Sequence, residues 1–182
     1  MDKSSLRRSI LARIRAFPGK EMESFLISSY LLESGMLARH DTILAFCPLD
    51  SEPDITPILK CRSVMLPYID HGRMGFSHYQ GLVKSALGFM EPAERIEGEY
   101  SSALMLVPLV AFDGNLNRLG RGKGFYDAYI NENKKRLCTV GIAFSVSQVP
   151  AVPVEDNDMR LDSILTVHDG KAMLLNCRKQ VF

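Results

Sequence analysis

Four apolar runs constrain the fold of this chain more than any other feature of its sequence. They cover residues 42–47, 64–67, 104–110 and 139–144, and each is nearly continuous instead of alternating with polar residues. Strands covered on both faces have this pattern, and parallel strands between two helical layers are covered in this way. The runs therefore predict an α/β fold, a three-layer αβα sandwich with a mainly parallel, Rossmann-like sheet.

Other segments complete the predicted architecture. Residues 163–167 read as a late strand, and residues 74–79 and 172–175 as edge or antiparallel strands. A basic first helix ends before Pro18 and carries apolar residues at helical spacing, at Leu6, Ile10, Ile14 and Phe17. A second helix is predicted from residue 20 to about residue 32, with a stripe facing the core formed by Met22, Phe25, Leu26 and Tyr30.

Length and composition favour one compact domain spanning residues 1–182. A chain of 182 residues with 46% hydrophobic content can close one sizeable core, and no long linker or internal repeat divides it. The net charge of +1 argues against a dedicated nucleic-acid binder. No apolar run approaches the roughly 20 residues that a membrane span needs, and the first residues lack a signal-peptide pattern. We therefore expect a cytoplasmic protein without membrane contact.

Neither the cysteines nor the histidines indicate a catalytic centre. Cys47, Cys61, Cys138 and Cys177 are scattered, which favours free thiols over zinc ligands or disulfides. The four histidines are dispersed, and no serine or cysteine lies in a nucleophile-elbow motif. Chemistry that needs no covalent protein nucleophile is therefore expected.

Residues 113–127 contain the clearest functional pattern. Within them Gly120, Gly122 and Gly124 alternate with Arg121 and Lys123. Alternating glycines let backbone N–H groups converge on an anion, and the two cations add full charges beside these dipoles. The spacing matches neither a P-loop nor a dinucleotide fingerprint. The stretch lies between an apolar strand and an expected helix start, a setting that favours an anion site over a solvated turn.

The ten residues from Arg118 to Asp127, RLGRGKGFYD, closely resemble the signature of the 5-formyltetrahydrofolate cyclo-ligase family. Other pieces agree in order: the basic N-terminal segment at residues 3–7, Glu52 after the first strand, Glu91-Pro92, and residues 152–162. The segment around Glu52 departs from the family pattern, because Pro53, Asp54 and Ile55 follow it.

The resemblance implies ATP-driven ring closure of 5-formyltetrahydrofolate to 5,10-methenyltetrahydrofolate by a monomeric enzyme that uses Mg²⁺. Arg121 and Lys123 are then the catalytic cations. ATP is expected to contact Lys3, Ser4, Ser5, Leu6, Arg7, Arg118, Leu119, Gly120, Arg121, Gly122, Lys123, Gly124, Phe125 and Tyr126. Glu52, Cys47 and Tyr126 are expected to contact the folate, and Asp127 and Asp162 to bind the metal.

All of these residues are expected in one cleft, because ligands in such sheets bind at the carboxyl ends of the strands. Residues 70–98, rich in glycine, are a candidate flap over the folate. Two other kinds of protein remain open on the residues alone. One is a sugar-phosphate isomerase or acyl-CoA transferase-like enzyme, and the other is a non-catalytic nucleotide- or RNA-binding module that uses the basic first helix.

Overall fold

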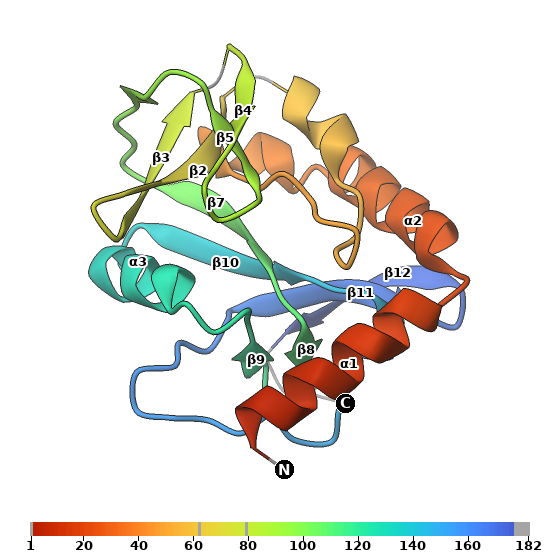
Figure 1. Cartoon of the computed structure of the whole chain (residues 1–182). Coiled ribbons are helices and arrows are strands. Elements are labelled where there is room, and N and C mark those ends of the chain that lie inside the picture. The colour runs from red at the N-terminus through yellow and green to blue at the C-terminus, as the bar shows by residue number, and fades with distance from the viewer. Residues whose placement is uncertain (1, 62, 79, 177–182) are drawn as a thin grey trace.

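An eight-stranded mixed sheet forms the centre of the molecule (Figure 1). The computed structural model describes residues 2–61, 63–78 and 80–176, so Cys177 lies outside the described residues. The strand order is β12-β11-β10-β7-β1-β2-β3-β6. Five neighbouring strands are parallel: β11 (Ser163–His168), β10 (Leu137–Ile142), β7 (Ala103–Pro108), β1 (Thr42–Leu44) and β2 (Val64–Asp70). The predicted parallel sheet is confirmed.

Antiparallel strands flank this parallel centre on both sides. On one side β12 (Lys171–Asn176) pairs with β11, and on the other β3 (Arg73–His78) pairs with β2 and then with β6 (Ile96–Glu97). Both segments that were predicted as edge or antiparallel strands are thus antiparallel, as expected.

Side chains on successive strand residues enter two separate cores, which explains the continuous apolar runs. Ile43 and Leu66 pack in one core with helix α2 (Lys20–Glu33) and the 3₁₀ helix η2 (Thr56–Lys60). Leu44 and Met65 pack in the other with helix α3 (Phe125–Asn133). The sheet is therefore buried on both faces, as its apolar strands require.

Helix α1 (Lys3–Ala16) belongs to neither layer and closes one end of the sheet. Its apolar residues Leu6, Ile10 and Ile14 pack against the segments that follow β7 and β10, including β8 (Ala111–Phe112) and β9 (Arg118–Leu119). Figure 1 shows α1, in red, beside this pair of short strands. Asp2 caps the helix by accepting hydrogen bonds from the N–H groups of Ser4 and Ser5.

The predicted core stripe of α2 is only partly correct. Leu26 and Tyr30 are half-buried against the core, but the side chains of Met22 and Phe25 are exposed, at 64% and 66%. The buried face instead follows Glu23, Ile27 and Leu31, at spacings of four residues. Glu23 is accepted in this face because its carboxylate receives hydrogen bonds from the N–H and hydroxyl of Ser145, in the 3₁₀ helix η3 (Ser145–Ser147).

The apolar run at residues 104–110, predicted as one strand, is a strand of the main sheet only as far as Pro108. The ladder between β7 and β10 ends at Pro108, and the chain then enters the β8–β9 hairpin before the glycine-rich loop. Proline has no N–H to donate to a ladder, so a break at this residue is expected.

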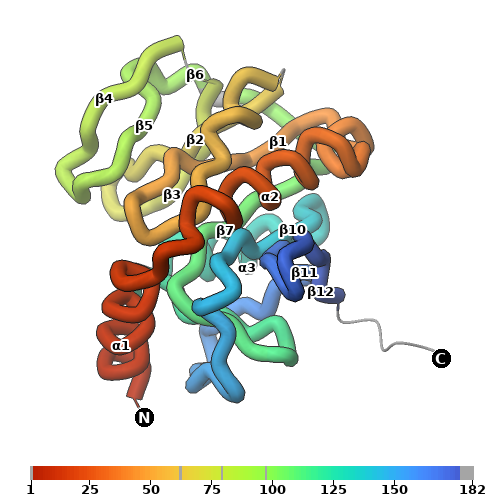
Figure 2. Tube along the Cα trace, turned by 90° about the vertical axis from the view of Figure 1, so that its right-hand side faces the viewer, coloured from red at the N-terminus to blue at the C-terminus, as the bar shows by residue number. Residues whose placement is uncertain are grey.

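A second small hairpin stands beside the sheet. Strands β4 (Leu82–Lys84) and β5 (Met90–Pro92) pair with each other, and β5 also contacts β2. Figure 2 shows this hairpin, in yellow-green, next to β2 and β3. A further short 3₁₀ helix, η1 (Leu37–Arg39), links α2 to β1. Among the described helices, none combines the length and apolar character needed to cross a membrane.

Asp113 fixes the turn of the β8–β9 hairpin. Its carboxylate is 1% exposed and accepts hydrogen bonds from the N–H groups of Asn115, Asn117 and Val152 and from the side-chain amide of Asn117. Burial alone would raise the pKa of Asp113, but these hydrogen bonds outweigh it and hold the pKa below its ordinary value. The carboxylate is therefore a stabilising anchor just upstream of the glycine-rich loop.

We expect Asp113→Asn to lower the free energy of unfolding by about 3 kcal/mol at pH 7, because it leaves buried donors without an acceptor. The folded-state pKa lies below the unfolded one, so this stabilisation is complete above the unfolded pKa and is lost as the pH falls through the folded pKa. Urea unfolding at pH 7 and in steps below pH 4 measures the free energy of unfolding of both proteins. The difference between wild type and variant should become smaller in acid. The exposed Asp41→Asn is the control; equal stability of both variants at pH 7 contradicts the role of Asp113.

Candidate active site

One cavity of about 1050 Å³ lies at the carboxyl ends of β1, β2 and β7. The glycine-rich loop and the N-terminus of α3 form its middle. On the side of α1 its wall is charged, with Lys3, Arg7, Glu155 and Asp158. On the side of β2 and β3 it is mostly apolar, and this wall consists of Phe46, Pro67, Ile69, Met74, Leu87 and Phe89. Leu87 and Phe89 belong to the β4–β5 hairpin region, which is part of the candidate flap at residues 70–98.

The glycine-rich loop has the backbone that its sequence predicts. Gly122 and Gly124 adopt left-handed conformations, with φ of +85° and +72°. Gly124 is also the N-cap residue of α3, and no side chain caps the first N–H groups of the helix. Such free N–H groups at a helix N-terminus bind anions well. The loop therefore has the geometry of a phosphate site next to Arg121 and Lys123.

The first helix contributes two cations to the same site. Arg7 donates a hydrogen bond from Nε to the carbonyl oxygen of Gly120, at 2.8 Å, and its guanidinium lies against Gly122. Lys3 forms ion pairs with Asp158 and Glu155, at 2.5 and 3.2 Å. Burial opposes the lysine's charge, but the hydrogen bonds to these two carboxylates outweigh it and raise the pKa of Lys3. Lys3 and Arg7 therefore face the same cavity from one side of α1.

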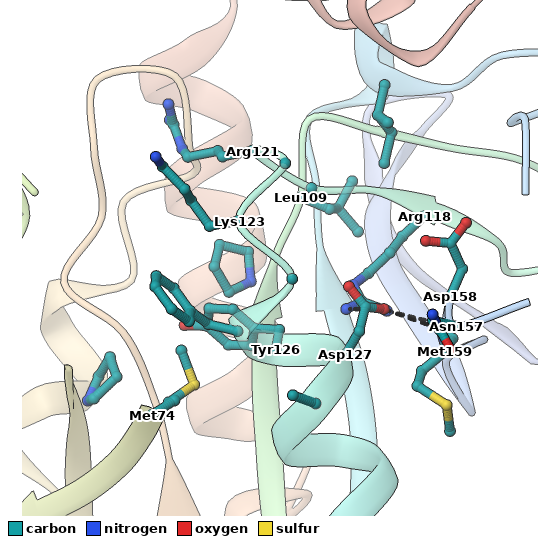
Figure 3. A pocket seen from close by; sticks show the side chains of 18 of the residues that line it. Met74, Leu109, Arg118, Arg121, Lys123, Tyr126, Asp127, Asn157, Asp158 and Met159 are labelled. Atoms are coloured by element: carbon teal, nitrogen blue, oxygen red, sulfur yellow. Dashed lines mark hydrogen bonds and ion pairs between the residues drawn. The ribbon is translucent and has the colours of Figure 1, made fainter. Parts of the chain in front are cut away.

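Arg118 and Asp127 join three segments beside the cavity. Arg118 is buried and donates hydrogen bonds to Asp127, at 2.8 Å, and to the carbonyl oxygen of Met159. Asp127 accepts the N–H of Met159 through the same oxygen, Oδ1, at 2.9 Å (Figure 3). Its other oxygen, Oδ2, has no hydrogen-bond partner within the described chain. Arg118 is thus a structural cation more than a free phosphate ligand.

Arg121 lies at the boundary between the charged and the apolar sides. Its Nε donates to Glu52 Oε1, at 3.0 Å, and its Nη2 donates to the hydroxyl of Ser51, at 2.5 Å. Lys123 points from the same loop, as Figure 3 shows. It is exposed and makes neither a hydrogen bond nor an ion pair with the residues that the structure describes. Lys123 is therefore available to an incoming anion.

Glu52 is an unusually placed carboxylate. It is 8% exposed, and its second oxygen accepts the N–H of Leu49 at 3.0 Å. Burial raises the pKa of Glu52, although the Arg121 charge and the hydrogen bonds oppose this. Burial and the nearby charge of Glu52 also raise the pKa of Tyr126. Cys47 lies in the same wall, and burial raises its pKa to about 11, which keeps the thiol protonated at neutral pH.

The structure brings most of the predicted site residues to this cavity, with three exceptions. Ser5 bonds to Asp2, and Leu6 is buried in the core beneath α1. Asp162 precedes β11, so it lies toward the amino ends of the strands, where it accepts hydrogen bonds from the N–H and hydroxyl of Thr139. The prediction that Asp162 shares the cleft is therefore wrong. A residue just before a parallel strand is at the opposite edge from one that follows it.

Asp158 is the acidic residue that the sequence reasoning missed. It lines the cavity near Asp127 (Figure 3) and is held by Lys3. Burial alone would raise the pKa of Asp158, but the hydrogen bonds from Lys3 and from the N–H of Glu155 outweigh this and lower the pKa. The signal was present, because Asp158 lies in the segment at residues 152–162 that carries the family resemblance.

Asp127 and Asp158 suit a magnesium ion that is bound partly by phosphates, and they do not form a complete metal site made of protein side chains alone. No described group of three His, Cys, Asp or Glu side chains is arranged to hold a metal. Mg²⁺, however, is often bound through one or two carboxylates together with substrate phosphates and waters. Two cavity carboxylates beside a phosphate-type loop match that pattern.

Fold and cavity together define an α/β enzyme whose large cleft is charged at one end and apolar at the other. The 5-formyltetrahydrofolate cyclo-ligase family matches residues 1–167, and the chain belongs to this family. The 5-formyltetrahydrofolate cyclo-ligase of Mus musculus is 27% identical, covering 90% of this chain and 92% of the mouse protein. That of Mycolicibacterium smegmatis is 29% identical, covering 92% and 95%.

Solved structures agree with this assignment. The 5,10-methenyltetrahydrofolate synthetase of Aquifex aeolicus superimposes with a TM-score of 0.81 at 27% identity, over 100% of this chain and 96% of its own. A 5,10-methenyltetrahydrofolate synthetase of Mycoplasma pneumoniae has a TM-score of 0.68 at 23% identity, over 98% of this chain and all of its own, and shows the same fold.

We expect Gly122→Ala to destabilise the protein by about 1–2 kcal/mol, because φ is positive there and a Cβ would lie 3.1 Å from the Arg7 guanidinium. Gly120→Ala is the matched control, since a Cβ at Gly120 meets no atom within 4 Å. Denaturant unfolding of both variants measures the difference. Equal stability of the two would show that the loop backbone is not constrained as described.

Proposed function

We propose that this protein converts 5-formyltetrahydrofolate and ATP to 5,10-methenyltetrahydrofolate, ADP and phosphate, in a magnesium-dependent reaction. Membership of the cyclo-ligase family supports the substrate and product. The single observation that carries the assignment is the composite cleft. A glycine-rich cationic loop at a helix N-terminus adjoins an apolar wall that contains one buried carboxylate, Glu52.

The two ends of the cleft suit the two substrates. The loop at residues 120–124, with Lys3 and Arg7 from α1, is placed to bind a triphosphate through backbone N–H groups and positive charge. The Glu52 carboxylate can accept hydrogen bonds from the donor-rich edge of a reduced pterin. The apolar side chains from β2, β3 and the β4–β5 hairpin cover an area suited to the flat rings.

The reaction we propose needs no covalent bond to the protein. The formyl oxygen on N5 attacks the γ-phosphorus and ADP leaves, which gives an iminium phosphate. N10 then attacks the activated carbon and its proton passes to the phosphate, which leaves as the C–O bond breaks and the ring closes. Positioning and neutralisation of charge dominate catalysis of phosphoryl transfer. Arg121 and Lys123 supply positive charge where negative charge develops on the phosphoryl group.

We assign the magnesium site to Asp127 and Asp158, in place of the pair of Asp127 and Asp162 expected from the sequence. Both carboxylates line the cleft, and Oδ2 of Asp127 is free of hydrogen bonds to described residues. When bound there, magnesium would neutralise charge on phosphate oxygens. A cytoplasmic location and a monomeric state stay predictions.

The assay for the proposed function is the ultraviolet absorption band of the methenyl product, formed from 5-formyltetrahydrofolate and Mg-ATP. We expect Lys123→Ala to lower kcat about a hundredfold, because the exposed lysine loses its charge at the γ-phosphate, and to leave the unfolding curve unchanged. Lys134→Ala, at the end of α3 and outside the cavity lining, is the charge-matched control. A folded wild-type protein that forms no such product rules out the function.

Substitution of the acidic residues tests the metal assignment. We expect Asp127→Asn and Asp158→Asn to raise the magnesium concentration needed for half-maximal rate by about tenfold, because each loses an anionic ligand. Asp162→Asn serves as the control: it should weaken stability through its bonds to Thr139 and leave the magnesium dependence as in wild type. The reverse pattern, with magnesium dependence altered only by Asp162→Asn, would refute the assignment.

A further inference from the structure

The ion pair between Glu52 and Arg121 links the two halves of the cleft. Arg121 belongs to the glycine-rich loop, whereas Glu52 belongs to the segment after β1 and faces the apolar side. The two residues are 69 positions apart in sequence, and Ser51 adds a second hydrogen bond to the same guanidinium. While this ion pair is formed, neither side chain is free to bind the substrate proposed for its end of the cleft.

We propose that Glu52 has a second role as a positioning residue: it holds Arg121 away from the phosphate site until folate binds, so that folate and nucleotide bind cooperatively. This inference rests on the proposed function, since it concerns the same two substrates.

The donors of Arg121 support the proposal. The edge of the guanidinium formed by Nε and Nη2 is occupied by Glu52 and Ser51. A phosphate that pairs with this edge, as phosphates commonly pair with arginine, must displace both. The Arg121 side chain is 41% exposed, so it can turn toward the phosphate site formed by the loop backbone without disturbing the core.

Displacement of Arg121 destabilises Glu52, because Glu52 then loses its counter-ion. Its side chain is only 6% exposed, and within the described chain its remaining partner is the N–H of Leu49. A buried carboxylate that loses its counter-ion is strongly destabilised. Tyr126 and Cys47, which lie nearby, bring no compensating positive charge. A nucleotide that binds alone therefore leaves an unpaired buried charge behind.

A bound pterin removes this cost. Its N–H groups can donate to Glu52 in place of Arg121, so that the carboxylate stays satisfied while the arginine turns to the phosphates. Each substrate then favours the binding of the other, and by linkage the two effects are equal. The catalytic cation reaches the phosphate only when the formyl group that must attack is present.

The test is calorimetric titration of a non-hydrolysable ATP analogue with Mg²⁺, with and without saturating 5-formyltetrahydrofolate. For wild type we expect the nucleotide Kd to fall about tenfold when folate is present, a size typical of such coupling. For Glu52→Gln we expect the nucleotide Kd without folate to be already about tenfold tighter than in wild type, and folate to change it little. A purely structural role of Glu52, or one confined to folate, would not tighten nucleotide binding.

Two further variants complete the design. Asp50→Asn makes the same change in formal charge two residues away, at an exposed carboxylate, and should keep the wild-type coupling. Ser51→Ala removes the second bond to Arg121 and leaves Glu52 intact; we expect nucleotide binding without folate to tighten about twofold. This variant keeps the proposal testable if Glu52→Gln fails to fold.

Three results separate the possible failures. If the nucleotide binds wild type equally well with and without folate while turnover is normal, the coupling is refuted and the function stands. If Glu52→Gln and Ser51→Ala leave the folate-free nucleotide Kd unchanged or weaker, the hold on Arg121 is refuted. If no variant binds nucleotide at all, the proposed function itself fails.

Discussion

The partly buried, hydrogen-bonded junction of Arg118, Asp127 and Met159 positions the charged end of the cleft. Arg118 begins β9, Asp127 lies in the first turn of α3, and Met159 lies in the connection between β10 and β11. Helix α3 shares no sheet ladder with the other two segments, so this junction sets how the helix meets them. The glycine-rich loop runs between two of its members and inherits their fixed positions. A loop with left-handed glycines would otherwise have too much freedom to present its N–H groups in one direction.

Charge in the cleft is largely neutralised by the protein's own ion pairs. Lys3 pairs with Asp158, Arg118 with Asp127, and Arg121 with Glu52. Such pairs keep several cations together in a partly buried site, where unpaired like charges would repel. They also mean that an incoming polyanion competes with carboxylates, so the free energy of binding includes the loss of these contacts. Lys123 is free of that competition among the described residues, which makes it the natural first contact.

The fold was more predictable from the sequence than the site. Continuous apolar runs are dictated by burial on both faces, and the parallel centre of the sheet follows from them almost without alternatives. The buried face of α2 could not be predicted in this way. Met22 and Phe25 are apolar yet exposed, while Glu23 is buried and hydrogen-bonded to Ser145. A polar residue satisfied by a partner 122 positions away leaves no mark on local periodicity. The prediction for Asp162 was wrong for a different reason. Asp162 precedes its strand, and in a parallel sheet this places it at the edge opposite to the residues that follow their strands.

Helix α1 shows why core and site cannot be separated in this molecule. Its apolar residues Leu6 and Ile10 pack beneath the ends of the sheet, and this packing fixes which face of the helix is buried. Lys3 and Arg7 are four residues apart, so they share the face next to the apolar one and point into the cleft. The hydrogen bond from Arg7 to Gly120 then ties the glycine-rich loop to the helix. Hydrophobic burial, which is not directional, thereby orients the charges on which anion binding depends.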